Sequence, residues 1–164
     1  MIVLIEGNEG TGKTTLINEL SKQIPFMTVK YPKEFKDTFY LLETFAASDR
    51  LFVLDRSFVS DLVYRRLDRQ KGQMNLEQIG RLCENRKDRI KIVFCNHDKA
   101  FENAMRRGED NIKVESVHKL LDNEFYSVKN LLRCFTDIET FDYNYDYTSV
   151  EDVLKFIRRD WNVY

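Results

Sequence analysis

The clearest chemical signal in this sequence is a glycine-rich loop near the N-terminus. Residues 7–15 read Gly-Asn-Glu-Gly-Thr-Gly-Lys-Thr-Thr and satisfy the phosphate-loop pattern G-x-x-x-x-G-K-[ST]. Glycines let backbone N–H groups converge on phosphate oxygens, and the start of the following helix adds its positive dipole end. In such a loop Lys13 reaches the β- and γ-phosphates, and the Thr14 hydroxyl can ligate Mg²⁺. We therefore predict that ATP is bound by Asn8, Glu9, Gly10, Thr11, Gly12, Lys13, Thr14 and Thr15.

A second pair of charged residues, Asp55 and Arg56, ends the third apolar segment of the chain. An acid that leaves a buried strand beside a phosphate loop is well placed to hold Mg²⁺, usually through a water. The adjacent arginine can reach the phosphate that is transferred or accepted. We expect Thr14 and Asp55 as metal ligands and Arg56 as a catalytic residue. Ser57 and Ser60 can equally serve as N-caps of the next helix.

A third candidate segment surrounds Arg106 and Arg107. It is polar, contains a glycine and separates two helical patterns, which is the composition of a mobile lid. Charge on a γ-phosphoryl group in transfer needs fixed cations, and an arginine from a closing loop supplies one while excluding water. We predict a lid over about 104–113, with Arg106 and Arg107 as catalytic residues beside Lys13 and Arg56. The alternative is a charged helix end on the surface.

The elements that position these residues follow from the hydrophobic pattern. Short apolar runs rich in β-branched residues predict strands at 2–5, 26–29, 51–54, 90–95 and 138–141. Helical spacing predicts helices at 14–23, 34–47, 58–69, 76–84, 100–106, 114–132 and 149–158. This alternation predicts an α/β fold with a five-stranded parallel sheet and helices on both faces. Ligands should then bind at the carboxyl ends of the strands.

Two groups of residues are predicted to be core. In the long helix, helical spacing assigns to the core Val114, Val117, Leu120, Leu121, Phe125, Val128 and Leu131. The cysteines Cys83, Cys95 and Cys134 form no CxxC pair, so we expect reduced thiols with a structural role in the core.

Composition narrows the class of protein. The chain has 164 residues, of which 43% are hydrophobic, and no segment of linker composition, so residues 1–164 are expected to form one domain. Its 26 basic and 27 acidic residues give a net charge of −1, which argues against wrapping of duplex nucleic acid. The apolar run that Glu6 ends is too short for a membrane span or a signal peptide, so we expect a cytoplasmic protein. The expected partners are small-molecule nucleotides, without membrane or nucleic acid, and a homodimer is left open.

Three motifs together resemble the thymidylate kinase and deoxynucleoside kinase group of P-loop kinases. They are IEGNEGTGKTTL at 5–16, LDRSFVSDLVY at 54–64 and RRGEDNIKVES at 106–116, and a closing helix SVEDVLKFI follows at 149–157. The resemblance covers most of the chain. It implies the P-loop kinase fold, with a five-stranded parallel sheet and an arginine-bearing lid, and the use of ATP with Mg²⁺.

The two branches of this group differ in the acceptor that they phosphorylate. Residues 5–8 resemble the opening of the deoxynucleoside kinases. Those kinases place a glutamate base after the second strand, where this chain reads Val-Lys-Tyr-Pro-Lys over 29–33, and only Glu34 could substitute. A monophosphate acceptor is already an anion, so it needs cations rather than a base. We favour phosphorylation of a deoxynucleoside monophosphate, a thymidylate-like pyrimidine, and keep a deoxynucleoside 5′-hydroxyl as the alternative acceptor.

The resemblance to thymidylate kinases also implies the acceptor site. Glu9 is similar to the acid that contacts the acceptor sugar, and Lys30, Arg50 and Arg56 are the cations offered to its phosphate. With the residues that fit the DR and AY positions of the family, the implied acceptor site is Glu9, Lys30, Arg50, Asp55, Arg56 and Tyr64. The stretch 35–50 supplies one helix where thymidylate kinases usually have two, which implies a rebuilt base pocket and an unusual pyrimidine. Candidates for stacking on the base, or alternatively core residues, are Tyr40, Phe45, Phe58 and Tyr64.

Other readings stay open at this point. A polynucleotide 5′-hydroxyl kinase needs an extended cationic groove. Its candidate residues, which also fit a solvated helix face, are Arg65, Arg66, Arg69 and Lys71. A non-catalytic nucleotide-binding module would bind ATP without forming ADP. The loop 146–149 either contacts adenine, as the resemblance implies, or caps the last helix.

Overall fold

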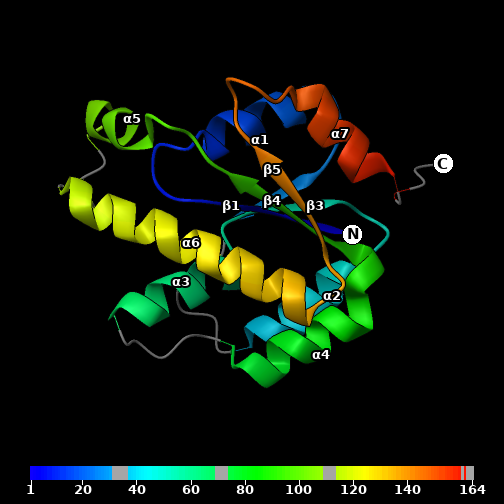
Figure 1. Ribbon diagram of the computed structural model, residues 1–164. Coiled ribbons are helices and arrows are strands. Elements are labelled where there is room, and N and C mark those ends of the chain that lie inside the picture. The colour runs from blue at the N-terminus through cyan, green and yellow to red at the C-terminus, as the bar shows by residue number, and fades with distance from the viewer. Residues whose placement is uncertain (31–36, 69–73, 109–113, 160, 162–164) are drawn as a thin grey trace.

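The computed structural model describes residues 1–30, 37–68, 74–108, 114–159 and 161 of the chain (Figure 1). Along these residues the elements are β1 (Ile2–Glu6), α1 (Lys13–Ser21), β2 (Met27–Lys30), α2 (Thr38–Ala47), β3 (Phe52–Asp55), α3 (Phe58–Asp68), α4 (Leu76–Arg86), a 3₁₀ turn η1 (Lys87–Arg89), β4 (Ile90–Cys95), α5 (Ala100–Arg106), α6 (Glu115–Phe135), β5 (Glu139–Tyr143) and α7 (Val150–Arg158). The predicted strands all form, with ends that differ by no more than two residues. The predicted start of α2, residues 34–36, lies outside the described residues.

The strands form one five-stranded sheet in the order β2-β3-β1-β4-β5, and every pair is parallel. The α/β fold class predicted from the sequence is therefore confirmed. β1 lies in the centre, with β3 on one side and β4 on the other, so the chain reverses its direction of winding about β1. Ligands of open parallel sheets bind at such a point, outside the carboxyl ends of the strands. The loop that follows β1 is placed there.

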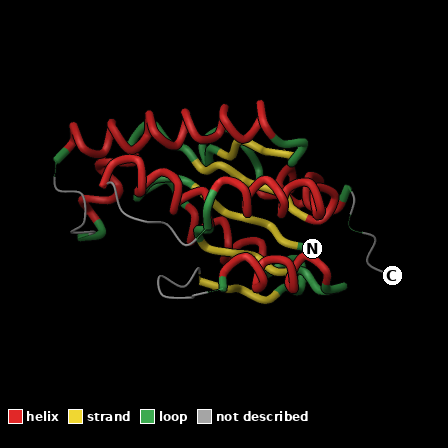
Figure 2. Tube along the Cα trace, turned by 90° about the horizontal axis from the view of Figure 1, so that it is seen from below, coloured by secondary structure: helices red, strands yellow, loops and turns green. Residues whose placement is uncertain are grey.

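Alternate side chains of the strands enter two separate cores because the sheet is covered on both faces. In β1, Ile2 and Leu4 join the core under α2, α3, α4 and α6, whereas Val3 and Ile5 join the core under α1 and α7. Figure 1 shows these two groups of helices on opposite sides of the sheet, and Figure 2 shows the layers from another direction. All five β1 residues are buried, including its last residue, Glu6.

The core prediction for α6 is correct for three of its seven residues. Leu121, Phe125 and Val128 are buried. The exposed residues, which the prediction placed in the core, are Val114, Val117, Leu120 and Leu131. The physical reason is that only one narrow stripe of α6 faces the sheet, and its spacing of three and four residues runs through His118, Leu121, Phe125, Val128 and Leu132. The exposed apolar residues lie beside that stripe.

The cysteine prediction holds for two of the three thiols. Cys83 and Cys95 are buried, and burial raises the pKa of each thiol to about 12, whereas Cys134 is exposed. Because the thiolate is the reacting form, iodoacetamide at mildly alkaline pH should label one thiol per native chain and all three after unfolding. Mass spectrometry of the intact chain gives the count, and Cys134→Ser should remove the native label. Fast labelling of Cys83 or Cys95 in the native chain would contradict this burial.

No helix in the described part of the chain combines the length and the apolar composition that a membrane crossing requires.

Candidate active site

The phosphate loop connects the end of β1 to the start of α1, and its backbone requires glycine. Gly7, Gly10 and Gly12 have φ values of 139°, 73° and 88°, in the region that other residues rarely adopt. At Gly10 there is a second reason, because a Cβ would lie 1.9 Å from the Ala100 carbonyl oxygen of α5. Only a glycine lets α5 pack this closely against the loop. The motif is therefore required by packing as well as by phosphate chemistry.

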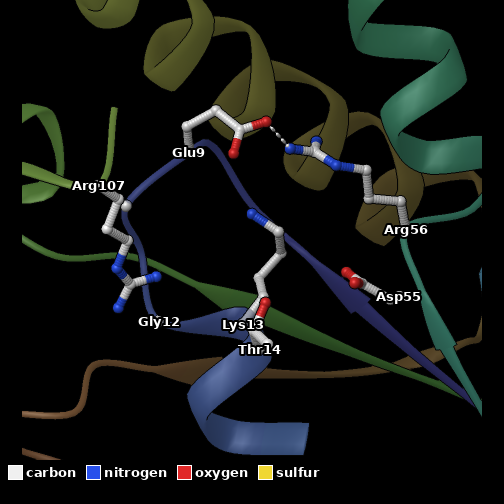
Figure 3. Close-up of a pocket in the computed structure, with 8 residues that line it drawn as sticks. Glu9, Gly12, Lys13, Thr14, Asp55, Arg56 and Arg107 are labelled. Atoms are coloured by element: carbon white, nitrogen blue, oxygen red, sulfur yellow. Dashed lines mark hydrogen bonds and ion pairs between the residues drawn. The ribbon is translucent and has the colours of Figure 1, made fainter. Parts of the chain in front are cut away.

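A pocket opens inside the loop at the carboxyl edge of the sheet. Its lining is Glu9, Gly10, Gly12, Lys13, Thr14, Asp55, Arg56 and Arg107. Three of the four predicted catalytic residues meet here, and Figure 3 shows Lys13 between Arg56 on one side and Arg107 on the other. They come from α1, from the end of β3 and from the end of α5, so three distant segments deliver cations to one space.

Lys13 is buried at the centre of this pocket. Its ammonium group donates a hydrogen bond to the Asn8 carbonyl oxygen, at 2.5 Å. Burial lowers the pKa of Lys13, and the nearby positive charge of Arg56 lowers it further. A buried ammonium group with few partners has much to gain from a bound anion. The loop is thus electrostatically prepared for phosphate.

Arg56 is held in an unusual backbone conformation. Its φ of 70° is the positive value of a residue other than glycine in the described chain, and its N–H donates to the Ile5 carbonyl oxygen at 3.1 Å. The guanidinium forms an ion pair with Glu9 and donates to the Tyr64 hydroxyl at 3.2 Å. Left-handed backbone strain of this kind persists where the surroundings determine it, often at functional sites. Here it turns the guanidinium toward the loop.

Glu6 is a residue of this site that the sequence analysis did not single out. Its carboxylate is fully buried and accepts hydrogen bonds from the hydroxyls of Ser57 and Ser60, the latter at 2.5 Å. Burial raises the pKa of Glu6, while the two serine hydrogen bonds and the charges of Arg56 and Lys13 oppose the rise. The two serines flank the turn after Arg56, so Glu6 ties that turn to β1. An acid at the end of an entirely buried strand was the signal for such pairing.

This burial of Glu6 predicts how stability changes with pH. The folded-state pKa lies above the unfolded value of about 4.5, so the contribution of Glu6 is most favourable below that value and declines as pH rises toward the folded pKa. Glu6→Gln cannot titrate. Its melting temperature relative to the parent should therefore increase as pH rises from about 4 to 7. Thermal unfolding across this range measures the difference, with the exposed Glu151→Gln as matched control. A relative melting temperature that falls with pH contradicts the assignment.

The two predicted metal ligands face the same pocket. Thr14 and Asp55 both line it, one from the first turn of α1 and the other from the end of β3 (Figure 3). No cluster of three or more metal-binding side chains is present among the described residues. Mg²⁺ commonly needs only one or two protein oxygens because phosphates and waters complete its shell. A hydroxyl and a carboxylate beside a phosphate loop therefore fit this ion.

We compared the chain with known proteins once this geometry was established. No protein-family model matches it. It is 25% identical over 117 residues to the adenylate kinase isoenzyme 6 homolog of Caenorhabditis elegans, and the match covers 69% of this chain and 63% of that protein. The chain thus spans less than two thirds of the length of this relative.

Two solved structures resemble the model over nearly the whole chain. The YorR protein of Bacillus subtilis, in complex with phosphorylated GDP, aligns with a TM-score of 0.76 and 18% identity, and the alignment covers 97% of this chain and 94% of YorR. The deoxyadenosine kinase of M. mycoides, with bound dCTP, aligns with a TM-score of 0.66 and 16% identity, over 97% of this chain and 100% of that one. This chain has the P-loop kinase fold. At such low identity the likeness establishes the fold alone.

Within the P-loop kinase fold, the remaining predicted residues are distributed as follows. Asn8 and Thr11 are buried inside the loop, and Thr15 is exposed on α1. Lys30 ends β2 in register with Asp55, at the carboxyl edge of the sheet. Tyr64 contacts Arg56.

The prediction for Arg50 is wrong. Arg50 precedes β3 and is exposed at the opposite, amino edge of the sheet, where its guanidinium lies 3.9 Å from the Met27 sulfur. A residue before a parallel strand lies at the far edge from a residue after it, so Arg50 cannot join a site built around Asp55 and Arg56.

The lid segment is described only in part. α5 ends at Arg106, which is exposed and does not line the pocket, whereas the next residue, Arg107, does. Residues 109–113 of the predicted lid lie outside the described residues. Glu34, the substitute base weighed from the sequence, lies outside them as well.

The aromatic candidates for base stacking separate clearly. Phe58 is buried, and Phe45 stacks on Phe52 with ring centroids 4.3 Å apart, so both belong to the core. Tyr40 is 68% exposed. Tyr64, half-buried beside Arg56, is the candidate that the fold brings to the pocket.

The other two alternatives from the sequence also meet a structural answer. Ser149 caps α7 in a capping box with Asp152, which confirms the capping interpretation for this residue. Of the cations proposed for a polynucleotide groove, Arg65 lies 3.4 Å from the Asp61 carboxylate and Arg66 lies 3.2 Å from the Glu124 carboxylate. Arg69 and Lys71 lie outside the described residues. The two described arginines are therefore already paired with acids of the same protein.

Proposed function

We propose that this protein transfers the γ-phosphoryl group of ATP to a deoxynucleoside monophosphate, a thymidylate-like pyrimidine, and forms the diphosphate and ADP. The observation that carries the proposal is the charge of the acceptor side of the pocket. Arg56 faces the phosphate loop, and Lys30 ends the neighbouring strand in register with Asp55. A cationic edge suits an acceptor that carries its own phosphate.

The acids that line the pocket support the same acceptor. Glu9 is paired with Arg56, and Asp55 is the carboxylate that fits Mg²⁺. A 5′-hydroxyl acceptor needs a base to take its proton, whereas a phosphate oxygen is already deprotonated at neutral pH. In the proposed reaction the bond from the γ-phosphorus to the oxygen that bridges it to the β-phosphate breaks. A new bond forms between that phosphorus and an oxygen of the acceptor phosphate.

Each residue of the pocket has a role in this proposal. Lys13 binds the β- and γ-phosphates of ATP, Arg56 orients the acceptor phosphate, and Arg107 stabilises the negative charge of the transferred group. Bound Mg²⁺ would neutralise phosphate charge, held by Thr14 and Asp55. Residues 1–164 would act as one kinase domain in the cytoplasm, with 104–113 as its lid. Catalysis in this scheme consists of positioning and electrostatics.

The test is an acceptor panel with labelled ATP and Mg²⁺. It contains pyrimidine and purine deoxynucleosides together with their 5′-monophosphates, and product diphosphates are separated from monophosphates by chromatography. We expect transfer to a pyrimidine monophosphate at least tenfold faster than to the matching nucleoside. Transfer to thymidine but not to its monophosphate would overturn the proposal, and ATP binding without ADP formation with any acceptor would indicate a non-catalytic module.

A deoxynucleoside kinase is the second candidate function. Two observations favour it: residues 5–8 resemble that branch, and a deoxyadenosine kinase is among the structures that share this fold. The same panel separates the two functions, because the products differ by one phosphate.

A further inference from the structure

Three side chains outside the pocket form a closed hydrogen-bonded cluster on the far side of the phosphate loop. They are Asn8 of the loop and two residues of α6, His118 and Asp122, and we call them the loop anchor. Asn8 and His118 are 1% and 2% exposed. None of the three lines the pocket around Lys13. The anchor therefore joins segments more than 100 residues apart without reaching the phosphate site itself.

The Asn8 side chain uses both ends of its amide. Its Nδ2 donates to the His118 carbonyl oxygen at 3.0 Å and to the Asp122 carboxylate at 2.9 Å. Its Oδ1 accepts from the Glu9 backbone N–H at 2.8 Å. An amide satisfied in this way has one orientation, because exchanging its oxygen and nitrogen would place like groups against each other.

The His118 ring completes the attachment. Its Nε2 lies 3.1 Å from the Glu9 carbonyl oxygen, and its Nδ1 lies 3.2 Å from the second oxygen of Asp122. The carbonyl only accepts hydrogen bonds, so a proton on Nε2 is what holds it. The Glu9 backbone is thus held at its N–H by Asn8 and at its carbonyl by His118.

The two loop residues that the anchor holds in turn orient the cations of the pocket. The Asn8 carbonyl accepts from the Lys13 ammonium group at 2.5 Å, and the Glu9 carboxylate is paired with Arg56. A shift in the backbone of these two residues would move both partners. Cations that act on transferred phosphate lose much of their effect when they are displaced by an ångström.

We propose that Asn8, His118 and Asp122 are positioning residues that set the orientation of Lys13 and Arg56 from outside the pocket. This inference rests on the proposed phosphotransfer function. It assigns to α6, beyond its share of the core, the task of fixing the phosphate loop in its active shape.

The test uses two replacements of His118 that each keep one of its contacts. The amide nitrogen of Gln occupies nearly the place of Nε2, and that of Asn the place of Nδ1. His118→Gln should therefore still hold the Glu9 carbonyl and keep kcat within about threefold of the parent. His118→Asn should keep only the Asp122 contact and lower kcat by about 10- to 100-fold. Lys119→Ala, an exposed residue beside His118 on the same helix, is the matched control and should match the parent.

A double exchange tests the other half of the anchor. Asn8→Asp places a carboxylate against that of Asp122 and against the His118 carbonyl, and should lower kcat more than tenfold. Adding Asp122→Asn restores a donor facing residue 8. The double variant should recover at least threefold of the loss, although it carries two changes.

The readouts separate this inference from the proposed function. Each variant is assayed for kcat well below its melting temperature, and its Kd for ATP is measured by isothermal titration calorimetry, which needs no turnover. A parent that binds ATP but phosphorylates no acceptor overturns the function, and the anchor is then judged by a Kd about tenfold weaker in His118→Asn than in His118→Gln. Equal kcat and Kd in the two folded variants overturn the anchor, and a parent that binds no ATP overturns both.

Discussion

Lys13→Ala is expected to lower kcat/KM for phosphate transfer by about 10²- to 10³-fold, which corresponds to about 3–4 kcal/mol of transition-state stabilisation. The reason is its position: Lys13 is the buried cation at the centre of the phosphate pocket, between Arg56 and Arg107. Its ammonium group is the partner that the loop offers to the β- and γ-phosphates. Steady-state kinetics with the best acceptor of the panel measures the loss.

The control for this substitution lies on the same helix. Lys22 follows α1, is exposed, and pairs with Glu19, so Lys22→Ala should leave kcat/KM within about twofold of the parent. The folded state should not depend on Lys13, because removing a buried ammonium group also removes the cost of burying its charge. A Lys13→Ala variant that is folded and keeps turnover within about threefold of the parent would refute the assigned role.

The sequence predicted the phosphate loop and the sheet well because both depend on local patterns. A glycine that needs positive φ, a lysine five residues after Asn8, and short apolar strands between helices are each visible within a few neighbouring residues. The direction of the strands then places Asp55 and Arg56 beside the loop. The same rule also disqualifies Arg50, since a residue that precedes β3 lies at the amino edge of the sheet.

The residues that the sequence did not reveal depend on long-range pairing. Glu6 has its partners in Ser57 and Ser60, and His118 has its partner in the backbone of Glu9. Nothing near His118 in the sequence distinguishes it from an ordinary buried residue on an amphipathic helix. A polar side chain must find a partner when it is buried, but only the packed structure decides which one.

Arg56→Ala is the second substitution with a large expected effect. It removes the guanidinium that faces the acceptor and leaves the Glu9 carboxylate without its ion-pair partner. We expect kcat/KM for the acceptor to fall by about 10²-fold or more, with a much smaller change in the Kd for ATP. Initial rates at saturating ATP and varied acceptor measure the first quantity, and calorimetry the second. Equal losses for both substrates would argue that Arg56 acts on ATP instead.

The backbone of Arg56 predicts a further difference between two otherwise similar variants. At a φ of 70° an alanine retains the left-handed strain, of about 1–2 kcal/mol, whereas glycine adopts this conformation freely. Arg56→Gly should therefore have a free energy of unfolding about 1 kcal/mol higher than Arg56→Ala, measured in urea, although both lack the guanidinium. Ser127, exposed within α6, is the matched site of opposite sign, because there Ala should be about 1 kcal/mol more stable than Gly. If alanine were the more stable residue at both positions, the strain at Arg56 would be absent, and the ties from Glu6 to the two serines would not be needed to maintain it. If glycine is the more stable residue at position 56 alone, the fold holds Arg56 in a conformation that its own backbone disfavours, and directs its guanidinium to the phosphate loop.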